Sequence, residues 1–308
     1  MTHAINRRTF LQSQASLVAG GAVVGSARRA AAAEPTIALG FSLYGMRSLE
    51  LDAAVAACAE IGYTAVELAV MAGWPADSAT LSKDARRRLR DRIGSLGLAL
   101  PALMENLPLD VDEPTHRRQL DRIKSAAELA HDVAIGPHPI IETILGGKPG
   151  EWDSIKAQFV QRLGDWLKIA AAADATIAVK PHRLGAMNTP ADAVWLVSQL
   201  GSGRLKLVYD FSHFEHRGMS IADTLRTMLP HTRFVHVKDS RVDGGRVQFL
   251  LPGAGATDYA ALFTHLREMG YRGSVCVEVS GQVHNRKDYD PLRAARFCYE
   301  KLSPAYRN

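Results

Sequence analysis

Cysteine is scarce in this 308-residue chain, and its three cysteines lie far apart in the sequence. Disulfide-built domains and zinc knuckles need several cysteines at short, regular spacings. Cys58, Cys276 and Cys298 each fall inside a predicted helix or strand, where a free cysteine behaves as a small buried apolar residue. The sequence therefore excludes a disulfide framework and a cysteine-based metal site.

A charge excess is also missing once the first 33 residues are set aside. The whole chain has 37 basic and 32 acidic residues and a net charge of +5. Residues 1–33 hold four arginines and no acidic residue, which leaves 33 basic against 32 acidic residues, a net charge of +1. Nucleic acid and anionic membranes require a basic surface. We therefore expect neither as a partner.

The four early arginines belong to a predicted export signal. Asn6-Arg-Arg-Thr-Phe-Leu-Gln12 is a twin-arginine sequence, residues 15–27 are mildly apolar, and residues 31–33 are alanines that suit a cleavage site. The alternative, an amphipathic helix, explains neither the Gly-Gly pair nor the alanine run. We predict a twin-arginine signal peptide over residues 1–33 and a periplasmic or secreted domain over 34–308. No later run of 18 apolar residues occurs, so we expect no membrane contact after cleavage.

The rest of the chain alternates between apolar strand patterns and helical patterns eight times. Most strand candidates are rich in Val, Ile and Leu without alternation, which is typical of strands covered on both faces. This repeat and a length of about 275 residues predict an α/β fold, a single (β/α)8 TIM barrel. The predicted strands are Ile37–Leu43, Ala65–Ala69, Ala99–Met104, Pro139–Ile144, Thr176–Lys180, Lys206–Phe211, Phe234–Lys238 and Ser274–Val279. The predicted helices are Leu51–Ile61, Lys83–Leu96, Thr115–Ala130, Trp152–Ala173, Pro190–Leu200, Ile221–Met228, Tyr259–Met269 and Pro291–Leu302.

Polar side chains gather where these strands end. Active sites of TIM barrels lie at the carboxyl ends of the strands, so these residues are the candidate site. Burying this many ionisable groups without a use is costly. They are Glu67, Glu105, Asn106, Glu142, Lys180, His182, Asp210, His213, His236, Lys238, Asp239 and Glu278.

Several motifs in the second half resemble the sugar phosphate isomerase/epimerase family, which has a xylose isomerase-like barrel. They are Asp210-Phe-Ser-His213, Val-His236-Val-Lys-Asp239, Pro252-Gly-Ala-Gly255, Gly270-Tyr-Arg-Gly273 and Val277-Glu278. The resemblance covers nearly the whole of residues 34–308. It is specific for the superfamily but weak for the reaction, because this fold hosts several chemistries.

The resemblance implies a divalent metal, commonly manganese, held by Glu, Asp, His and Glu at four strand ends. Carried onto matching positions, Asp210, His236 and Glu278 are three of the ligands, a set that suits manganese, magnesium, cobalt or zinc. The first ligand should be the Glu of a Glu-x-His motif, but this chain has Lys180-Pro-His182. An ammonium group cannot ligate a metal.

Three interpretations of Lys180 stay open. In the first, the metal remains on Asp210, His236 and Glu278, with Glu142 or water completing its shell. In the second, Lys180 replaces the metal and its ammonium group forms salt bridges with Glu142, Asp210 and Glu278. In the third, Lys180 is desolvated enough to form a Schiff base.

The expected reaction starts with abstraction of a proton next to a carbonyl, which needs a base and a positive group near the developing oxyanion. The resemblance implies Glu278 as one proton-moving carboxylate. Glu142 is the candidate for the second carboxylate, on the opposite face of the substrate, and Lys180 and His182 are further catalytic candidates. We expect substrate contacts from His213, Lys238 and Glu105.

The predicted export favours a non-phosphorylated sugar or keto-sugar as the small-molecule substrate, because sugar phosphates are scarce outside the cytoplasm. An isomerase or epimerase is the first hypothesis. A lyase acting on 3-keto-glycosides would begin with the same proton abstraction. A secreted sugar-binding barrel without catalysis is the non-enzyme alternative, and an endonuclease would need more histidines and a basic face. The sequence leaves the oligomeric state open, a homo-oligomer included.

Overall fold

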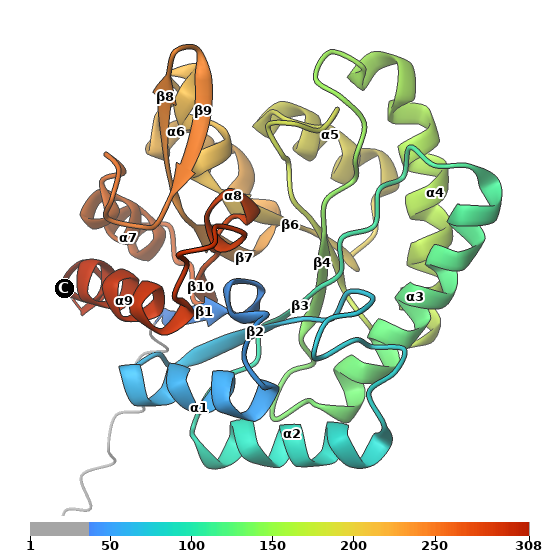
Figure 1. Ribbon diagram of the computed structural model, residues 1–308. Coiled ribbons are helices and arrows are strands. Elements are labelled where there is room, and N and C mark those ends of the chain that lie inside the picture. The colour runs from blue at the N-terminus through green and yellow to red at the C-terminus, as the bar shows by residue number, and fades with distance from the viewer. Residues whose placement is uncertain (1–36, 308) are drawn as a thin grey trace, which may run out of the picture. The chain divides into compact units, whose positions relative to one another are not determined.

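The fold is a closed barrel of eight parallel strands surrounded by helices (Figure 1). The structure, a computed structural model, describes residues 37–307, so the predicted signal peptide lies outside the described residues. The strands close in the order β1-β10-β7-β6-β5-β4-β3-β2. The predicted (β/α)8 barrel is therefore confirmed.

Each predicted strand is present, with bounds that differ from the prediction by up to three residues. The largest difference is at the third strand, which begins at Ala102 because Pro101 has no N–H for the ladder, while Ala99 makes only an isolated bridge to Ala65. The barrel strands are β1 Ala38–Ser42, β2 Ala65–Ala69, β3 Ala102–Met104, β4 Ile140–Thr143, β5 Ile177–Val179, β6 Leu205–Asp210, β7 Thr232–Val237 and β10 Ser274–Val277.

The predicted helices are also present, and local caps explain their ends. Thr189 accepts the Asp192 N–H and Asp192 accepts the Thr189 N–H, a capping box that starts α5 with Pro190 in its first turn. Gly62 ends α1 with φ 111°, a left-handed conformation that favours glycine. The main helices are α1 Leu51–Ile61, α2 Lys83–Ser95, α3 Glu113–Asp132, α4 Trp152–Ala172, α5 Pro190–Leu200, α6 Ile221–Met228, α7 Tyr259–Glu268 and α9 Pro291–Arg307. Among the described helices, none is long and apolar enough to cross a membrane.

A two-stranded hairpin between β7 and α7 was not predicted. It consists of β8 Asp239–Asp243 and β9 Arg246–Leu250 and projects away from the barrel in Figure 1. Gly244 and Gly245 form its turn with φ 54° and 76°, the conformation that tight hairpin turns require. A short helix, α8 Gly281–His284, follows the last barrel strand and was also missed.

The barrel interior contains an apolar layer that sets the height of the polar layer above it. Alternate strand residues point the same way, so the residue two positions later lies one layer nearer the carboxyl ends. The apolar layer is Ala102, Ile140, Ala178, Val208, Phe234 and Cys276, all buried. Two residues later come Met104, Glu142, Lys180, Asp210, His236 and Glu278.

The predicted burial of all three cysteines is confirmed.

Candidate active site

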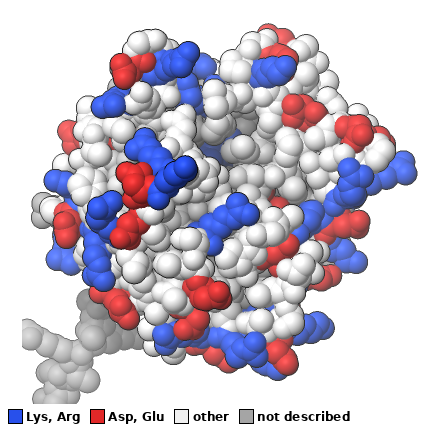
Figure 2. Space-filling view, viewed as in Figure 1, with Lys and Arg blue, Asp and Glu red and all other residues white. Residues whose placement is uncertain are grey.

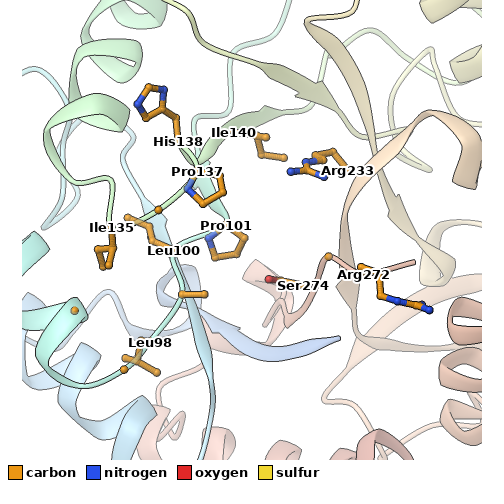
Figure 3. A pocket seen from close by; sticks show the side chains of 15 residues that line it. Leu98, Leu100, Pro101, Ile135, Pro137, His138, Ile140, Arg233, Arg272 and Ser274 are labelled. Carbon is orange, nitrogen blue, oxygen red and sulfur yellow. The ribbon is translucent and has the colours of Figure 1, made fainter. Parts of the chain in front are cut away.

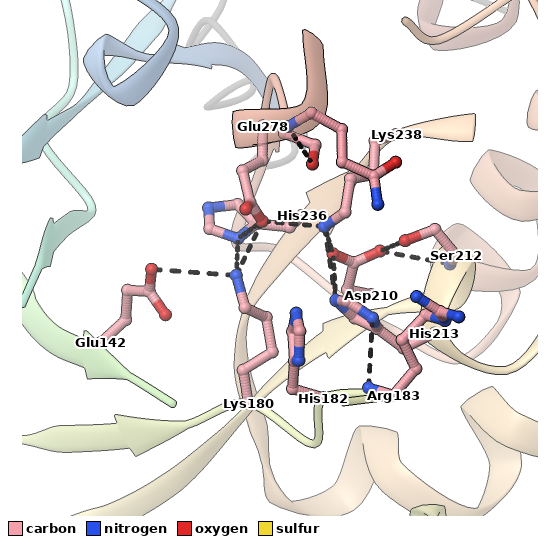
Figure 4. Close-up of polar contacts among 12 residues, drawn as sticks. Glu142, Lys180, His182, Arg183, Asp210, Ser212, His213, His236, Lys238 and Glu278 are labelled. Carbon is pink, nitrogen blue, oxygen red and sulfur yellow. Dashed lines mark hydrogen bonds and ion pairs between the residues drawn. The ribbon is translucent and has the colours of Figure 1, made fainter. Parts of the chain in front are cut away.

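The five ionisable side chains of the polar layer and Lys238, which lies one layer above them, come together from five neighbouring strands (Figure 4). Each is at most 8% exposed, although five of the six are charged types that are seldom buried without a partner. They are Glu142 in β4, Lys180 after β5, Asp210 at the end of β6, His236 in β7, Lys238 after β7 and Glu278 after β10. We call this group the lysine cluster.

Lys180 is held by residues on three other strands. Its Nζ donates to Oε2 of Glu278 at 2.7 Å and lies 2.9 Å from Nδ1 of His236. Oε1 of Glu142 lies 3.9 Å from the same Nζ. The ammonium group therefore sits among side chains that the resemblance assigns to a metal.

A second ammonium group, from Lys238, reaches the same carboxylate. Its Nζ lies 3.0 Å from Oε2 of Glu278 and forms an ion pair with Asp210, which also accepts a hydrogen bond from the Ser212 hydroxyl at 2.6 Å. The second interpretation of Lys180 included salt bridges to Glu142, Asp210 and Glu278; the structure has the first and the last, but Asp210 pairs with Lys238. Asp210 pairs with Lys238 because Lys238 lies one layer higher on the adjacent strand.

Electrostatics keep both sides of these pairs charged. Burial alone would lower the pKa of Lys180, but Glu142, Glu278 and Asp210 outweigh it and raise that pKa. Burial would raise the pKa of Glu278, but Lys180 and Lys238 hold it well below its usual range. A Schiff-base lysine needs a depressed pKa, so this environment does not favour the third interpretation of Lys180.

Glu142 differs from the other carboxylates because neither of its oxygens has a hydrogen-bond partner. It is fully buried, and burial raises its pKa to about 7 against the opposing effect of Lys180. An unpartnered carboxylate that titrates near neutral pH is suited to take up and return a proton.

His236 is fixed by a residue to which the sequence assigned no role. Oε2 of Glu67 in β2 lies 2.9 Å from Nε2 of His236, and both side chains are fully buried. Burial would lower the pKa of His236, but Glu67 and Glu278 raise it to about 9. Glu67 is one of the strand-end candidates from the sequence, but no sequence pattern indicates its pairing with His236.

His182 and His213 form a neutral pair beside the cluster. Their ring centroids are 4.3 Å apart, and burial lowers the pKa of both, to about 4 for His213. Nδ1 of His182 accepts the N–H of Leu184 at 3.3 Å, which leaves the ring proton on Nε2. His182 can therefore donate a hydrogen bond to a bound molecule without carrying charge.

Glu105 is not part of the lysine cluster. Its carboxylate pairs with Arg122 at 2.5 Å, and Arg122 also binds Asp77 at 2.5 Å. This network ties the segment after β2 to α3. The sequence gives no sign of this pairing with Arg122, and the substrate contact expected from Glu105 stays a prediction.

The hairpin covers one side of the cluster. The Phe249 ring, 3% exposed, lies 5.2 Å from Nζ of Lys238 and 5.4 Å from the His213 ring. Its backbone N–H donates to the side chain of Gln282 in α8 at 3.0 Å. Ser240 donates to Glu215 at 2.8 Å, so the hairpin is bound to its neighbours at both strands.

A pocket of about 160 Å³ opens on the other side. Its lining comes from the segments after β4 and β5 and includes Lys180 and His182 together with glycine and aliphatic residues. A larger cavity of about 500 Å³ lies at the opposite end of the barrel, before β3, β4 and β10, with Leu98, Pro101 and Arg233 in its wall (Figure 3). It contains none of the predicted site residues.

The visible face carries acidic and basic side chains intermixed, without a field of one sign (Figure 2). This agrees with the near-neutral charge of residues 34–308.

A family model described as xylose isomerase-like TIM barrel matches residues 55–296, and the chain belongs to this family. Inosose dehydratase of Geobacillus kaustophilus is 25% identical over 285 residues, which cover 83% of this chain and 85% of that protein. L-ribulose-5-phosphate 3-epimerase of Salmonella paratyphi C is 22% identical over 229 residues, 73% of this chain and 80% of that enzyme.

Solved structures share the fold at lower identity. The 3-keto-D-glucoside 4-epimerase of E. coli superposes with a TM-score of 0.68 and 18% identity, covering 87% of this chain and all of that one. A zinc-bound IolI protein gives a TM-score of 0.69 and 20% identity, with 87% of this chain and 99% of that chain covered. The matched relatives thus include epimerases and a dehydratase, and the particular reaction is not fixed by them.

A metal suggested by the resemblance can be tested against the donor atoms. Glu67, Glu142 and His236, and likewise Asp210, His236 and Glu278, lie close enough together to hold an ion. Their carboxylate and imidazole atoms are suitable ligands. However, the ammonium groups of Lys180 and Lys238 already contact all three members of the second group. As folded, the second group does not fit a divalent cation.

Proposed function

We propose that this protein is a sugar isomerase or epimerase that removes a proton next to the carbonyl of a non-phosphorylated sugar or keto-sugar. One observation carries the proposal: the unpartnered carboxylate of Glu142 lies 3.9 Å from the ammonium group of Lys180 in a buried site. A base beside a fixed positive charge is what formation of an enolate requires.

Glu142 is the proposed base. Its carboxylate takes the proton from the carbon beside the carbonyl, and the electron pair of that C–H bond forms a carbon–carbon double bond as the carbonyl oxygen becomes an oxyanion. The Lys180 ammonium group stabilises this oxyanion. Return of the proton by Glu142 to the former carbonyl carbon, with transfer of the neighbouring hydroxyl proton to the oxyanion, moves the carbonyl. Inversion of the stereocentre instead takes a proton from water on the opposite face, and Glu142 then loses its own proton to solvent.

The remaining cluster residues hold these two groups in place. Glu278 binds both lysines, and the low pKa that results makes it a weaker base than Glu142, so we assign Glu278 an anchoring role. Lys238 and His213 complete the covered side of the site. His182 lines the pocket and is proposed to donate a hydrogen bond from Nε2 to a substrate hydroxyl.

The substrate is proposed to be uncharged. Among the described residues that line the pocket, Lys180 is the one lysine or arginine, and its ammonium group is already bound by Glu278. A phosphate group needs uncommitted cationic donors, usually arginine. The twin-arginine sequence supports the same choice, because an exported enzyme meets few sugar phosphates.

A lyase acting on 3-keto-glycosides is the second candidate, favoured by the similarity to an inosose dehydratase over 83% of the chain. After the same proton abstraction, the electron pair would expel the group bound to the carbon β to the carbonyl. Free aglycone would then accumulate in place of an isomeric sugar.

The test is hydrogen exchange in deuterated water with a panel of neutral ketoses and 3-keto-glycosides, followed by mass spectrometry. The native protein should introduce deuterium beside the carbonyl, and Glu142→Gln should lower the rate by roughly 10²–10⁴-fold. Glu128→Gln, an exposed change on α3, is the matched control. Binding of a sugar without exchange by the native protein would identify a binding barrel instead.

A further inference from the structure

The lysine cluster has the charge and contacts of a filled metal site. We propose that the paired ammonium groups of Lys180 and Lys238 stand in the place of a divalent cation, so that the native protein holds no resident metal there. The proposal rests on the proposed function only in giving the ammonium groups the metal's role of stabilising an oxyanion. Its test measures metal content and not turnover.

Oε2 of Glu278 accepts from Lys180 at 2.7 Å and from Lys238 at 3.0 Å, so both ammonium groups meet on one oxygen. A metal bound through that oxygen would need its lone pairs directed at the ion. They are directed at the two lysines instead.

The other two donors are occupied in the same way. Asp210 forms an ion pair with Lys238, and Nδ1 of His236 lies 2.9 Å from Nζ of Lys180. The second nitrogen of His236 is turned toward Glu67. Each member of the ligand triad thus has a lysine where a metal would lie.

Charge gives an independent reason. Four buried carboxylates, from Glu67, Glu142, Asp210 and Glu278, face two ammonium groups and the imidazole of His236. Two lysine charges equal the charge of one divalent ion, so the ammonium groups already supply the positive charge that a metal would bring. A cation added beside them would be repelled at short range in a site of low dielectric.

The alternative is that a metal enters and pushes Lys180 aside. It would have to separate the ammonium group from Glu278 and leave a buried charge without its partner, which is unfavourable. This alternative predicts a native protein that carries metal.

The experiment compares metal content by elemental analysis in the native chain, Lys180→Glu and Lys124→Glu, all produced in medium with added manganese and zinc. Lys180→Glu removes the ammonium group and supplies the missing carboxylate ligand. Lys124→Glu makes the same charge change at an exposed position on α3. We expect less than about 0.1 ion per chain in the native protein and in Lys124→Glu, and about one ion per chain in Lys180→Glu.

Two results would overturn the proposal. One is a native protein with about one bound ion per chain, which needs no variant to interpret. The other is a folded Lys180→Glu protein that stays free of metal and shows no rise in melting temperature with Mn²⁺ or Zn²⁺ added at about 1 mM, a concentration well above the Kd of ordinary catalytic sites. That result would show that Lys180 does not keep the cation out.

Discussion

Glu67 and His236 are 169 residues apart in the sequence, yet Oε2 of Glu67 lies 2.9 Å from Nε2 of His236 inside the barrel. Strands β2 and β7 are not neighbours in the barrel, so the contact crosses its interior. It fixes the imidazole whose other nitrogen faces Lys180. A carboxylate with no surface exposure thereby orients the centre of the lysine cluster.

This contact predicts a stability effect. Glu67→Ala removes one partner of a buried pair and should lower the free energy of unfolding by about 3–5 kcal/mol. Urea denaturation measures it. Glu60→Ala, at an exposed position of α1, should change the value by less than about 0.5 kcal/mol. Equal effects of the two substitutions would mean that the Glu67–His236 contact contributes nothing.

Glu142 predicts a pH dependence of activity. Burial raises the pKa of Glu142 to about 7, and a base works only as the carboxylate. The value of kcat/KM should therefore rise as pH increases through about 7 and level off above it. A pH profile between about 5 and 9 checks this. An enzyme fully active at pH 5 would exclude Glu142 as the base.

The pair of Lys238 and Asp210 predicts a rescue. Lys238→Met leaves the buried charge of Asp210 without its ammonium partner, at a cost of about 3–5 kcal/mol of unfolding free energy. Adding Asp210→Asn removes that charge, so the double variant should unfold at a higher urea concentration than Lys238→Met alone. Purely additive losses would show that the two side chains are not coupled.

Gly40 in β1 predicts a packing limit in the barrel wall. A Cβ at this position would come within 3 Å of both the sulfur of Cys276 and the carbonyl of Ala65, so Gly40→Ala should destabilise the fold by about 1–3 kcal/mol. Gly164→Ala is the matched control, because a Cβ there meets nothing within 4 Å and α4 should gain about 0.5–1 kcal/mol. Thermal unfolding distinguishes the two signs.

The barrel could be predicted from the sequence because each of its units repeats one local pattern. A buried strand such as β2 needs a continuous apolar run, and the cap residue Thr189 followed by Pro190 marks the start of a helix such as α5. Both signals are local. The hairpin at residues 239–250 was missed because it breaks the repeat, although Gly244 and Gly245 marked its turn.

The sequence was enough to predict which residues lie in the site, but not which of their side chains contact one another. Strand ends identified Lys180, Asp210, His236 and Glu278, because a parallel barrel brings all strand ends to one rim. Which lysine meets which carboxylate depends on strand register and on the height of each side chain, so Lys238 rather than Lys180 reaches Asp210. Glu105 also follows a strand end and so looked equivalent to these residues in the sequence, but in the structure it pairs with Arg122 of α3.

The hairpin has a consequence for the way a substrate reaches the site. Its first strand begins at Asp239, the residue after Lys238, and the Asp239 carboxylate accepts the N–H groups of Gly253 and Gly255 and the hydroxyl of Tyr259. The hairpin therefore cannot swing outward without displacing an ammonium group that Glu278 depends on. It forms one wall of the site, and the pocket beside Lys180 has Gly146 and Gly147 in its lining instead.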